Sequence, residues 1–372
     1  MKQRRLSLQI ILTVVPIILS LSITALLIMA VNADPGSVFE KVWEGAFRDS
    51  RSFSQVVNFW IPLTLVSIGL IVTFTAGLWN IGVEGQMMIG AVAASWAALY
   101  VPLPSVIAIP FEILLAVLGG ALWAALVAVL KTRLGVHEIF GGVGLNALAN
   151  VLSIYLISGP WQPPQGGSVH STDPFPESAV LPPISADFQV SYLALVIVFV
   201  SIVAVVLALR GTRWGLQLKA TGKNARSALL LGVPTERSAV TAMMVCGALA
   251  GIAGSYRVLF TYDSLRPLVS GGIGFLGLLV VLLVANRALW VPFVAFAFAA
   301  ILGGSTRLKV ALQLDQSLAG VLQGFLVLSA LLFNGLRQRI QERTTVDEES
   351  PASVPLKTTP PTKTPAEAMT RE

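Results

Sequence analysis

Residues 188–209 read FQVSYLALVIVFVSIVAVVLAL and contain no Asp, Glu, Lys or Arg. A run of about 20 apolar residues has the length of an α-helix that crosses the roughly 30 Å hydrocarbon core of a bilayer. The sequence therefore predicts an all-α membrane protein, a polytopic bundle of about 10 transmembrane helices. The remaining apolar runs, some short or interrupted by glycine as in broken helices, lie near residues 8–31, 56–77, 86–101, 105–130, 139–158, 237–256, 271–285, 288–304 and 316–334.

The composition of the whole chain agrees with a lipid environment. Of its 372 residues, 55% are hydrophobic and 12% are charged, and the mean hydropathy is +0.78, whereas soluble domains average roughly 45–50% apolar and 25% charged residues. We expect one transmembrane domain over residues 1–340. It begins with a retained span, because the apolar stretch 8–31 exceeds a signal-peptide core of roughly 7–15 residues. Residues 341–372, rich in Pro, Thr, Lys and Glu, are expected to form a disordered cytoplasmic tail.

Basic residues are concentrated in one long connection, 210–237, whereas the long connection 159–187 has no Lys or Arg. The positive-inside rule places the first in the cytoplasm and the second on the opposite side. With an even number of spans, both termini are then predicted to be cytoplasmic. Because the basic residues lie in connections between spans, the net charge of +6 needs no nucleic-acid partner, and none is expected.

Catalytic and metal-binding motifs are missing from the sequence. It contains two histidines and one cysteine, Cys246, with no zinc-ligand spacing and no hydrolase motif. His137-Glu138, at the start of a predicted helix, is interpreted as a helix cap. No G-x-x-x-x-G-K-[ST] motif is present, so we predict that the chain does not hydrolyse ATP by itself. We predict no catalytic residue, no metal and no cofactor, and a protein that is not an enzyme.

A polar segment at residues 79–86 interrupts two apolar runs. Trp79, Asn80, Glu84 and Gln86 lie in it together with two glycines. Unwound backbone with hydrogen-bonding side chains lines cavities in transporters, and we interpret these four residues as part of a substrate-translocation path. An ordinary cytoplasmic turn is the alternative.

Asn146, Asn150 and Phe275 are further candidates for this path. Asn146 and Asn150 are four residues apart and share a helix face, where they either line a pore or hydrogen-bond between helices. Phe275 follows a glycine-rich stretch at 270–274, which indicates either a second broken helix or close packing of small residues. Glu112 is the clearest carboxylate within a predicted span, and it either lines a path or lies near the outer interface.

A short helix is predicted within the basic connection, in a segment of about residues 215–233. The sequence gives it a start with a cap, exposed basic residues and a glycine-proline end. Such a helix suits docking to a partner protein, whereas positive-inside charge alone explains the basic residues but not the cap and the end. The residues that we expect to couple to this partner are Gly222, Lys223, Asn224, Arg226 and Gly232.

The connection between the first two spans predicts another short helix. Ser37 and Glu40 have capping-box spacing, and apolar residues then recur with a helical period up to Phe47. This helix either lies flat on the outer interface or packs against the bundle.

Together these motifs resemble the membrane permease subunits of ATP-binding cassette importers, in the branch that holds branched-chain amino acid, simple sugar and nucleoside permeases. The resemblance covers about residues 56–340 and is carried by NIGVEGQ at 80–86, the segment 215–232 and GALAGIAG at 247–254. Within that branch, GVHEI at 135–139, Leu145-Asn146 and the proline-rich connection after it are similar to nucleoside-type permeases that work with basic-membrane-lipoprotein binding proteins. His137 and Gly144 stand where that type commonly has Asn and Met, which leaves the substrate open.

The resemblance implies a multi-pass permease of the prokaryotic plasma or inner membrane that imports nucleosides or related small polar solutes. It implies that two cytoplasmic ATP-binding cassette subunits bind and hydrolyse the ATP. The other implied partners are a second permease subunit in a homo- or heterodimer, an extracytoplasmic solute-binding lipoprotein and membrane lipid. The alternatives are a simple sugar or branched-chain amino acid permease, and a stand-alone secondary transporter.

Overall fold

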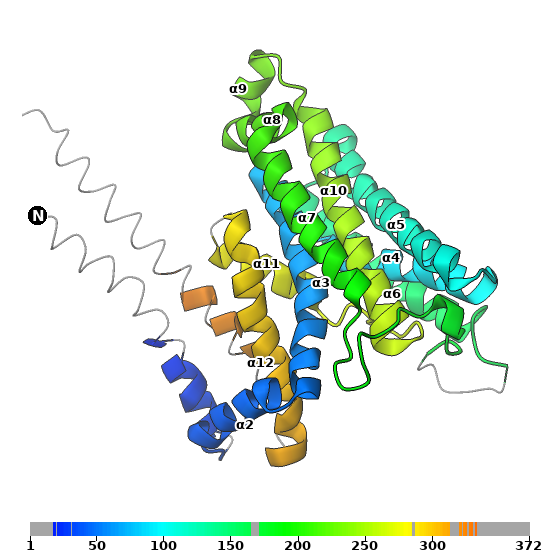
Figure 1. Cartoon of the computed structure of the whole chain (residues 1–372). Coiled ribbons are helices and arrows are strands. Elements are labelled where there is room, and N and C mark those ends of the chain that lie inside the picture. The colour runs from blue at the N-terminus through cyan, green and yellow to red at the C-terminus, as the bar shows by residue number, and fades with distance from the viewer. Residues whose placement is uncertain are drawn as a thin grey trace, which may run out of the picture.

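The computed structural model describes residues 18–19, 21–30, 32–164, 171–284 and 287–312, with 320–321, 323–325, 327–329 and 332. All regular elements in these residues are helices (Figure 1), which confirms the predicted all-α class. In chain order they are α2 (Pro35–Phe47), α3 (Ser50–Thr75), α4 (Val83–Tyr100), α5 (Ser105–Leu134), α6 (Glu138–Ser158), η1 (Glu177–Ala179), α7 (Tyr192–Gly211), α8 (Arg213–Lys223), α9 (Ala225–Leu230), α10 (Thr235–Tyr256), the π-helix η2 (Arg257–Tyr262), α11 (Ile273–Leu283), η3 (Ala288–Trp290) and α12 (Val291–Leu312).

Six helical stretches within these described ranges are long and apolar enough to cross a membrane. They are α3, α5, α6, α7, α10 with η2, and η3 with α12. Leu21–Ala30 and α2 pass the same test only as a pair, bent by 109°. The predicted count of about ten spans and the sidedness of the termini therefore stay predictions.

Four of the predicted apolar runs do not correspond to any of these six stretches. The run near 86–101 corresponds to α4, which carries Glu84 and Gln86 in its first turn and is not among the six candidate spans. The run near 271–285 contains α11, whose 11 residues are about 16 Å long and cover only half of a bilayer core. About half of each of the runs near 8–31 and 316–334 lies outside the described residues, and the tail 341–372 lies wholly outside them.

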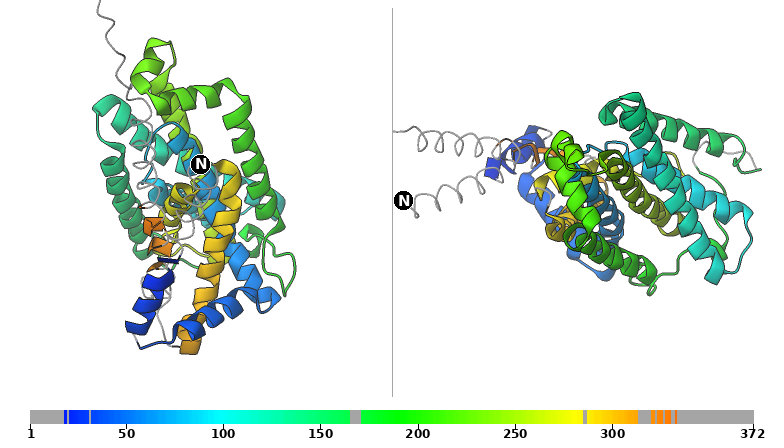
Figure 2. Two further views of the ribbon diagram at one scale, coloured as in Figure 1. Left: turned by 90° about the vertical axis from the view of Figure 1, so that its left-hand side faces the viewer. Right: turned by 90° about the horizontal axis from the view of Figure 1, so that it is seen from above.

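The central helix of the bundle is α3. Its most apolar stretch is 83% buried, compared with 17% for α6 and 28% for α7, which turn most of their side chains outward. Figures 1 and 2 show α3 and α10 in the middle, α2 and α12 at one edge, and α4, α5 and α6 at the other. The Asp49 carboxylate accepts a hydrogen bond from the Ser52 N–H at 2.7 Å and fixes the start of α3 at Ser50, earlier than residue 56, where the predicted span begins.

Glycines let α4, α5 and α10 pack with their backbones in contact. A Cβ atom added at Gly90 would lie 2.3 Å from Gly251 Cα, and one at Gly120 would lie 2.1 Å from the Gly247 carbonyl oxygen. A Cβ at Gly251 would lie 2.0 Å from the Ala116 carbonyl oxygen. The GALAGIAG segment is thus the face of α10 on which α4 and α5 rest, because any larger residue would separate these helices.

The short helix predicted before α3 is confirmed as α2, but its cap is not Ser37. Asp34 is the N-cap, its carboxylate accepts from the Ser37 N–H at 2.7 Å, and the following Pro35 occupies the first helical turn. The helix packs against the bundle, since a Cβ at Gly45 would lie 2.4 Å from the Gly304 carbonyl oxygen of α12.

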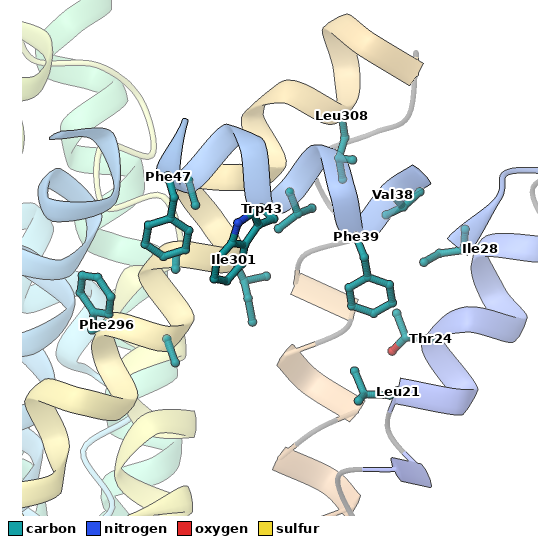
Figure 3. Close-up of a pocket in the computed structure, with 14 residues that line it drawn as sticks. Leu21, Thr24, Ile28, Val38, Phe39, Trp43, Phe47, Phe296, Ile301 and Leu308 are labelled. Carbon is teal, nitrogen blue, oxygen red and sulfur yellow. The ribbon is translucent and has the colours of Figure 1, made fainter. Parts of the chain in front are cut away.

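An apolar pocket of about 460 Å³ lies between α2, α12 and Leu21–Ala30. Figure 3 shows Trp43, Phe47, Phe296 and Ile301 along one side of it and Leu21 toward the other. It has almost no polar lining and lies at the edge of the bundle, away from the polar segment 79–86. We therefore do not assign it to the path of a polar solute.

Candidate functional site

Two helices, α4 and α11, begin inside the bundle, and their N-terminal ends meet at Glu84. A Cβ added at Gly274 would lie 2.9 Å from Glu84 Cα. One turn further along α11, Gly277 faces the side chains of Val66 and Leu70 in the interior of α3. The segments 79–86 and 270–275, which the sequence marks as two separate breaks, therefore form one junction of broken helices.

The Glu84 carboxylate closes this junction. Its Oε1 accepts a hydrogen bond from the Gly272 N–H at 2.9 Å, and its Oε2 accepts from the Gly274 N–H at 2.6 Å. A carboxylate at a helix N-terminus satisfies free N–H groups and opposes the positive end of the helix dipole. Gly272 has φ +77, a left-handed conformation that favours glycine at the turn leading into α11.

Asn80 and Gln86 pair with each other across the turn that precedes α4. The Asn80 Nδ2 donates to Gln86 Oε1 at 2.9 Å, and the Gln86 Nε2 donates to Asn80 Oδ1 at 2.9 Å. The Asn80 Nδ2 also lies 3.1 Å from the sulfur of Cys246 on α10. Both amides are fully buried, so in this conformation they hold the turn together and do not face an open cavity.

Asn146 ties α6 to the same turn. Its Oδ1 accepts from the Gly85 N–H at 2.7 Å, and its Nδ2 donates to the Ile81 carbonyl at 2.9 Å. Of the two readings of Asn146, the interhelical hydrogen bond is therefore the one observed. Asn150, one turn further along α6, is not brought into the cluster: its buried Oδ1 has no hydrogen-bond partner among the described residues.

Trp79 and Phe275 are the accessible aromatic residues beside the junction. Trp79 is 45% exposed and Phe275 47%. The Trp79 ring lies 5.0 Å from that of Phe74, and the Trp79 backbone N–H donates to Glu138 Oε1 at 3.4 Å. Glu138 also pairs with Lys131 at the end of α5, so it anchors the start of the polar segment. His137 is the N-cap of α6, as predicted.

Arg257 is a residue of this region that the sequence interpretation missed. Only 4% exposed, it lies with its guanidinium 4.6 Å from the centre of the Tyr262 ring and 5.7 Å from that of Phe59. Its Nε donates to the Val269 carbonyl at 3.2 Å, and no carboxylate of the described residues is in salt-bridge range. Arg257 thereby holds the loop that presents Gly272 and Gly274 to Glu84. The aromatic residues Tyr256 and Tyr262 nearby in the sequence are a signal that could have indicated an arginine packed against rings.

Glu112 is buried on α5, and its Oε2 has no hydrogen-bond partner in the described part of the chain. It does not contact Glu84, Asn80 or Asn146 through any hydrogen bond that the structure shows. Glu112 is therefore separate from the junction.

The short helix predicted within the basic connection is present as two helices, α8 and α9, joined at Asn224; its docking role stays a prediction. The Asn224 N–H donates to the Ala220 carbonyl at 3.1 Å at the end of α8, and its Oδ1 accepts from the Ser227 N–H at 2.9 Å at the start of α9. Gly232, with φ +81, follows the end of α9. Lys223 and Arg226 are exposed. Leu230 and Leu231, each 84% exposed, give the end of this element an apolar tip.

Gly222 places this element directly against the end of α3. A Cβ at Gly222 would lie 2.2 Å from the Thr75 carbonyl oxygen and 3.0 Å from the Gly77 N. Gly77, with φ +75, turns the chain out of α3 toward Trp79 and Asn80. The α8–α9 element and the helix junction are thus connected through only a few residues of backbone.

A buried junction of broken helices, joined to an exposed helical connection, is typical of membrane transport proteins. The chain belongs to the family described as "Branched-chain amino acid transport system / permease component", which matches residues 52–331. It is an ABC transporter permease subunit and a multi-pass membrane protein, and its relatives are transport permease subunits.

Three relatives are each similar to most of the chain. A glucose ABC transporter permease protein of Haloferax volcanii is 27% identical over 324 residues, 85% of this chain and 85% of that protein. The guanosine ABC transporter permease protein of Bacillus subtilis is 28% identical over 301 residues, 78% of this chain and 84% of that protein. A nucleoside ABC transporter permease protein of Lactococcus lactis is 24% identical over 313 residues, 80% of this chain and 84% of that protein.

Proposed function

We propose that this permease imports nucleosides or related small polar solutes, driven by ATP that partner subunits hydrolyse. The observation that carries the proposal is the contact between Gly222 of α8 and the Thr75–Gly77 corner. An ATPase that moves the α8–α9 element would push on the residues that lead into the helix junction. The proposed coupling residues are Gly222, Lys223, Asn224, Arg226 and Gly232.

The chemistry around the junction favours an uncharged polar solute with a ring. The Glu84 carboxylate is occupied by hydrogen bonds from backbone N–H groups, and the polar side chains of the turn before α4 are the neutral amides of Asn80, Gln86 and Asn146. Trp79 and Phe275 offer exposed aromatic faces for stacking. The proposed translocation residues are Trp79, Asn80, Glu84, Gln86, Asn146, Asn150 and Phe275, with Asn80 and Gln86 reaching the solute only after their pairing opens.

Relatives that carry guanosine and nucleosides support this substrate class, and the glucose permease relative keeps a simple sugar as the second candidate. In this proposal the chain works in the plasma or inner membrane of a prokaryote. It pairs with a second permease, two cytoplasmic ATPases and an extracytoplasmic binding lipoprotein.

Uptake of labelled guanosine, uridine and glucose by the assembled transporter in proteoliposomes tests the proposal. We expect ATP-dependent nucleoside uptake that competes with unlabelled nucleosides and not with glucose. Glucose uptake without nucleoside uptake would establish the sugar alternative. Uptake by the permease alone, driven by a proton gradient, would identify a secondary transporter and contradict the proposal.

A further inference from the structure

A basic pocket lies where α7, α8, the end of α3 and η3 meet. Its volume is about 340 Å³. It lies at the end of the bundle from which α8 and α9 project (Figure 1), the end predicted to be cytoplasmic. The residues that line it are Thr75, Val206, Leu209, Arg210, Lys219, Arg287, Ala288, Leu289 and Trp290.

Three cations from three separate elements share this pocket. Arg210 comes from the last turn of α7, Lys219 from α8 and Arg287 from the residue before η3. All three side chains are exposed, and none of them forms a salt bridge with an acidic side chain of the described chain. Like charges gathered without a counter-ion repel one another. The pocket therefore favours binding of an anion that can accept hydrogen bonds from several cations at once.

Exposed apolar side chains, here called the apolar lane, continue from the cations along α7 and beside η3. On α7, Phe199, Val203 and Leu207 are exposed and spaced four residues apart, which puts them in one stripe leading to Arg210. On the other side, Trp290 and Phe293 are exposed, with their ring centres 5.9 Å apart. Tryptophan beside basic residues at the end of a span is typical of the membrane–water interface.

This combination selects one class of ligand. A soluble phosphate would contact the cations but not the apolar lane. An acidic protein surface would not extend along α7 into the membrane. We propose that the pocket binds an anionic glycerophospholipid, with its phosphate on Arg210, Lys219 and Arg287 and an acyl chain along α7 and Trp290. The inference does not depend on which solute the permease carries.

The bound lipid would connect α8 to the bundle. Lys219 lies on the same helix as Gly222, which contacts the end of α3. A phosphate shared by Lys219, Arg210 and Arg287 would therefore hold the α8–α9 element against α7 and η3.

Native mass spectrometry of the complete chain, titrated with phosphatidylglycerol or with phosphatidylcholine in detergent, tests the site. The pocket variant carries Arg210→Gln, Lys219→Gln and Arg287→Gln. Arg133→Gln, Arg213→Gln and Arg237→Gln form the matched control, since they remove equal charge at the same end of the bundle outside the pocket. Each interfacial cation contributes roughly fivefold to binding of an anionic lipid, so we expect affinity for phosphatidylglycerol to fall about 100-fold in the pocket variant and to change little in the control.

Two further experiments distinguish a lipid headgroup from a soluble anion. We expect 10-fold molar excesses of glycerol phosphate over phosphatidylglycerol to displace no lipid, and Trp290→Ala to weaken lipid binding. Displacement by glycerol phosphate would assign the pocket to a soluble anion. Equal binding of the two lipids, equal loss in the control, or loss of ATPase co-purification by the pocket variant at unchanged lipid binding would each overturn the proposal.

Discussion

Glu84 and Glu112 are two buried carboxylates in opposite surroundings. Glu84 accepts two backbone hydrogen bonds from the start of α11, whereas Glu112 Oε2 has no partner in the described residues. A buried charge stabilises a fold only where hydrogen bonds replace the water that it loses. The two residues therefore provide a matched pair of variants.

We expect Glu84→Gln to lower stability by about 2 kcal/mol, because it removes charge-assisted hydrogen bonds from the N-terminus of α11. Glu112→Gln should leave stability unchanged or raise it, because it removes an unpaired buried carboxylate. Thermal unfolding of both variants in the same detergent measures the difference. An equal loss in the two variants would show that Glu112 has a partner as strong as that of Glu84.

The Asn80–Gln86 pair gives a second prediction. Asn80→Leu leaves the Gln86 amide buried and unpaired and should cost about 1–3 kcal/mol. The double variant Asn80→Leu with Gln86→Leu should recover most of that stability. If these amides contact the solute, uptake stays low in the double variant although the fold is restored. Full recovery of uptake would limit both residues to a structural role.

At the scale of residues, the sequence predicted a set of neighbouring polar side chains but not the contacts that they make. Asn80, Glu84, Gln86 and Asn146 were predicted and do meet at one turn. Their partners come from α6, α10 and the start of α11, and a pattern along the chain does not specify such distant contacts. Asn150 shares a helix face with Asn146 but lies one turn further along α6. Only Asn146 hydrogen-bonds to the turn before α4.

At the scale of elements, the α8–α9 element, below called the arm, consists of two helices that meet at Asn224. It contacts the end of α3 through Gly222. The contact admits no side chain, since a Cβ at Gly222 would overlap the Thr75 carbonyl. A displacement of α8 toward α3 would therefore press directly on the Thr75–Gly77 backbone.

We expect Gly222→Ala to push α8 away from α3 and to lower uptake by about tenfold or more, while ATPase activity of the assembled transporter persists. Gly211→Ala is the matched control, because no atom lies within 4 Å of its Cβ position and it stands at the same end of the bundle. Parallel measurements of ATP hydrolysis and uptake distinguish uncoupling from misfolding. Unchanged uptake in Gly222→Ala would remove this contact from the coupling route.

The arm itself is tested by Arg226→Glu combined with Asn224→Ala. The second change removes the cap of α9, which is worth about 1 kcal/mol, and the first reverses an exposed charge. We expect less ATPase to co-purify with the permease, with the helical content by circular dichroism unchanged. Arg237→Glu, an exposed residue outside the arm, serves as the control, and equal co-purification of both variants would exclude α9 from the interface.

Element types followed from the sequence, and element lengths did so only in part. Apolar runs located α5, α6 and α10 because each crosses the bundle as one uninterrupted helix. The start of α3 lies earlier than predicted because Asp49 caps it. The helix α11 is shorter than the predicted run 271–285 because the residues before Ile273 form a loop, which Arg257 holds through the Val269 carbonyl. In both places a specific hydrogen bond overrides hydropathy.

At the scale of the whole molecule, the connections 159–187 and 210–237 are predicted to lie on opposite sides of the membrane. Cys246 is the one cysteine of the chain and is buried, so single-cysteine variants are simple to make on a Cys246→Ser background. Leu230→Cys should react with a membrane-impermeant maleimide only in inverted vesicles, and Asp187→Cys only in intact cells. Labelling of both from one side would refute the predicted topology.

The glycine contacts among α4, α5 and α10 have a consequence for how this molecule moves. Helices whose backbones touch cannot rotate past one another without first separating, and their amides stay shielded throughout. Hydrogen exchange should therefore be slowest in these three helices in every state of the transport cycle. The amides of 268–274, in the loop that leads into the half-length helix α11, should exchange faster than those of the three helices. The α4–α5–α10 packing would then be the rigid support against which the helix junction and the α8–α9 element move.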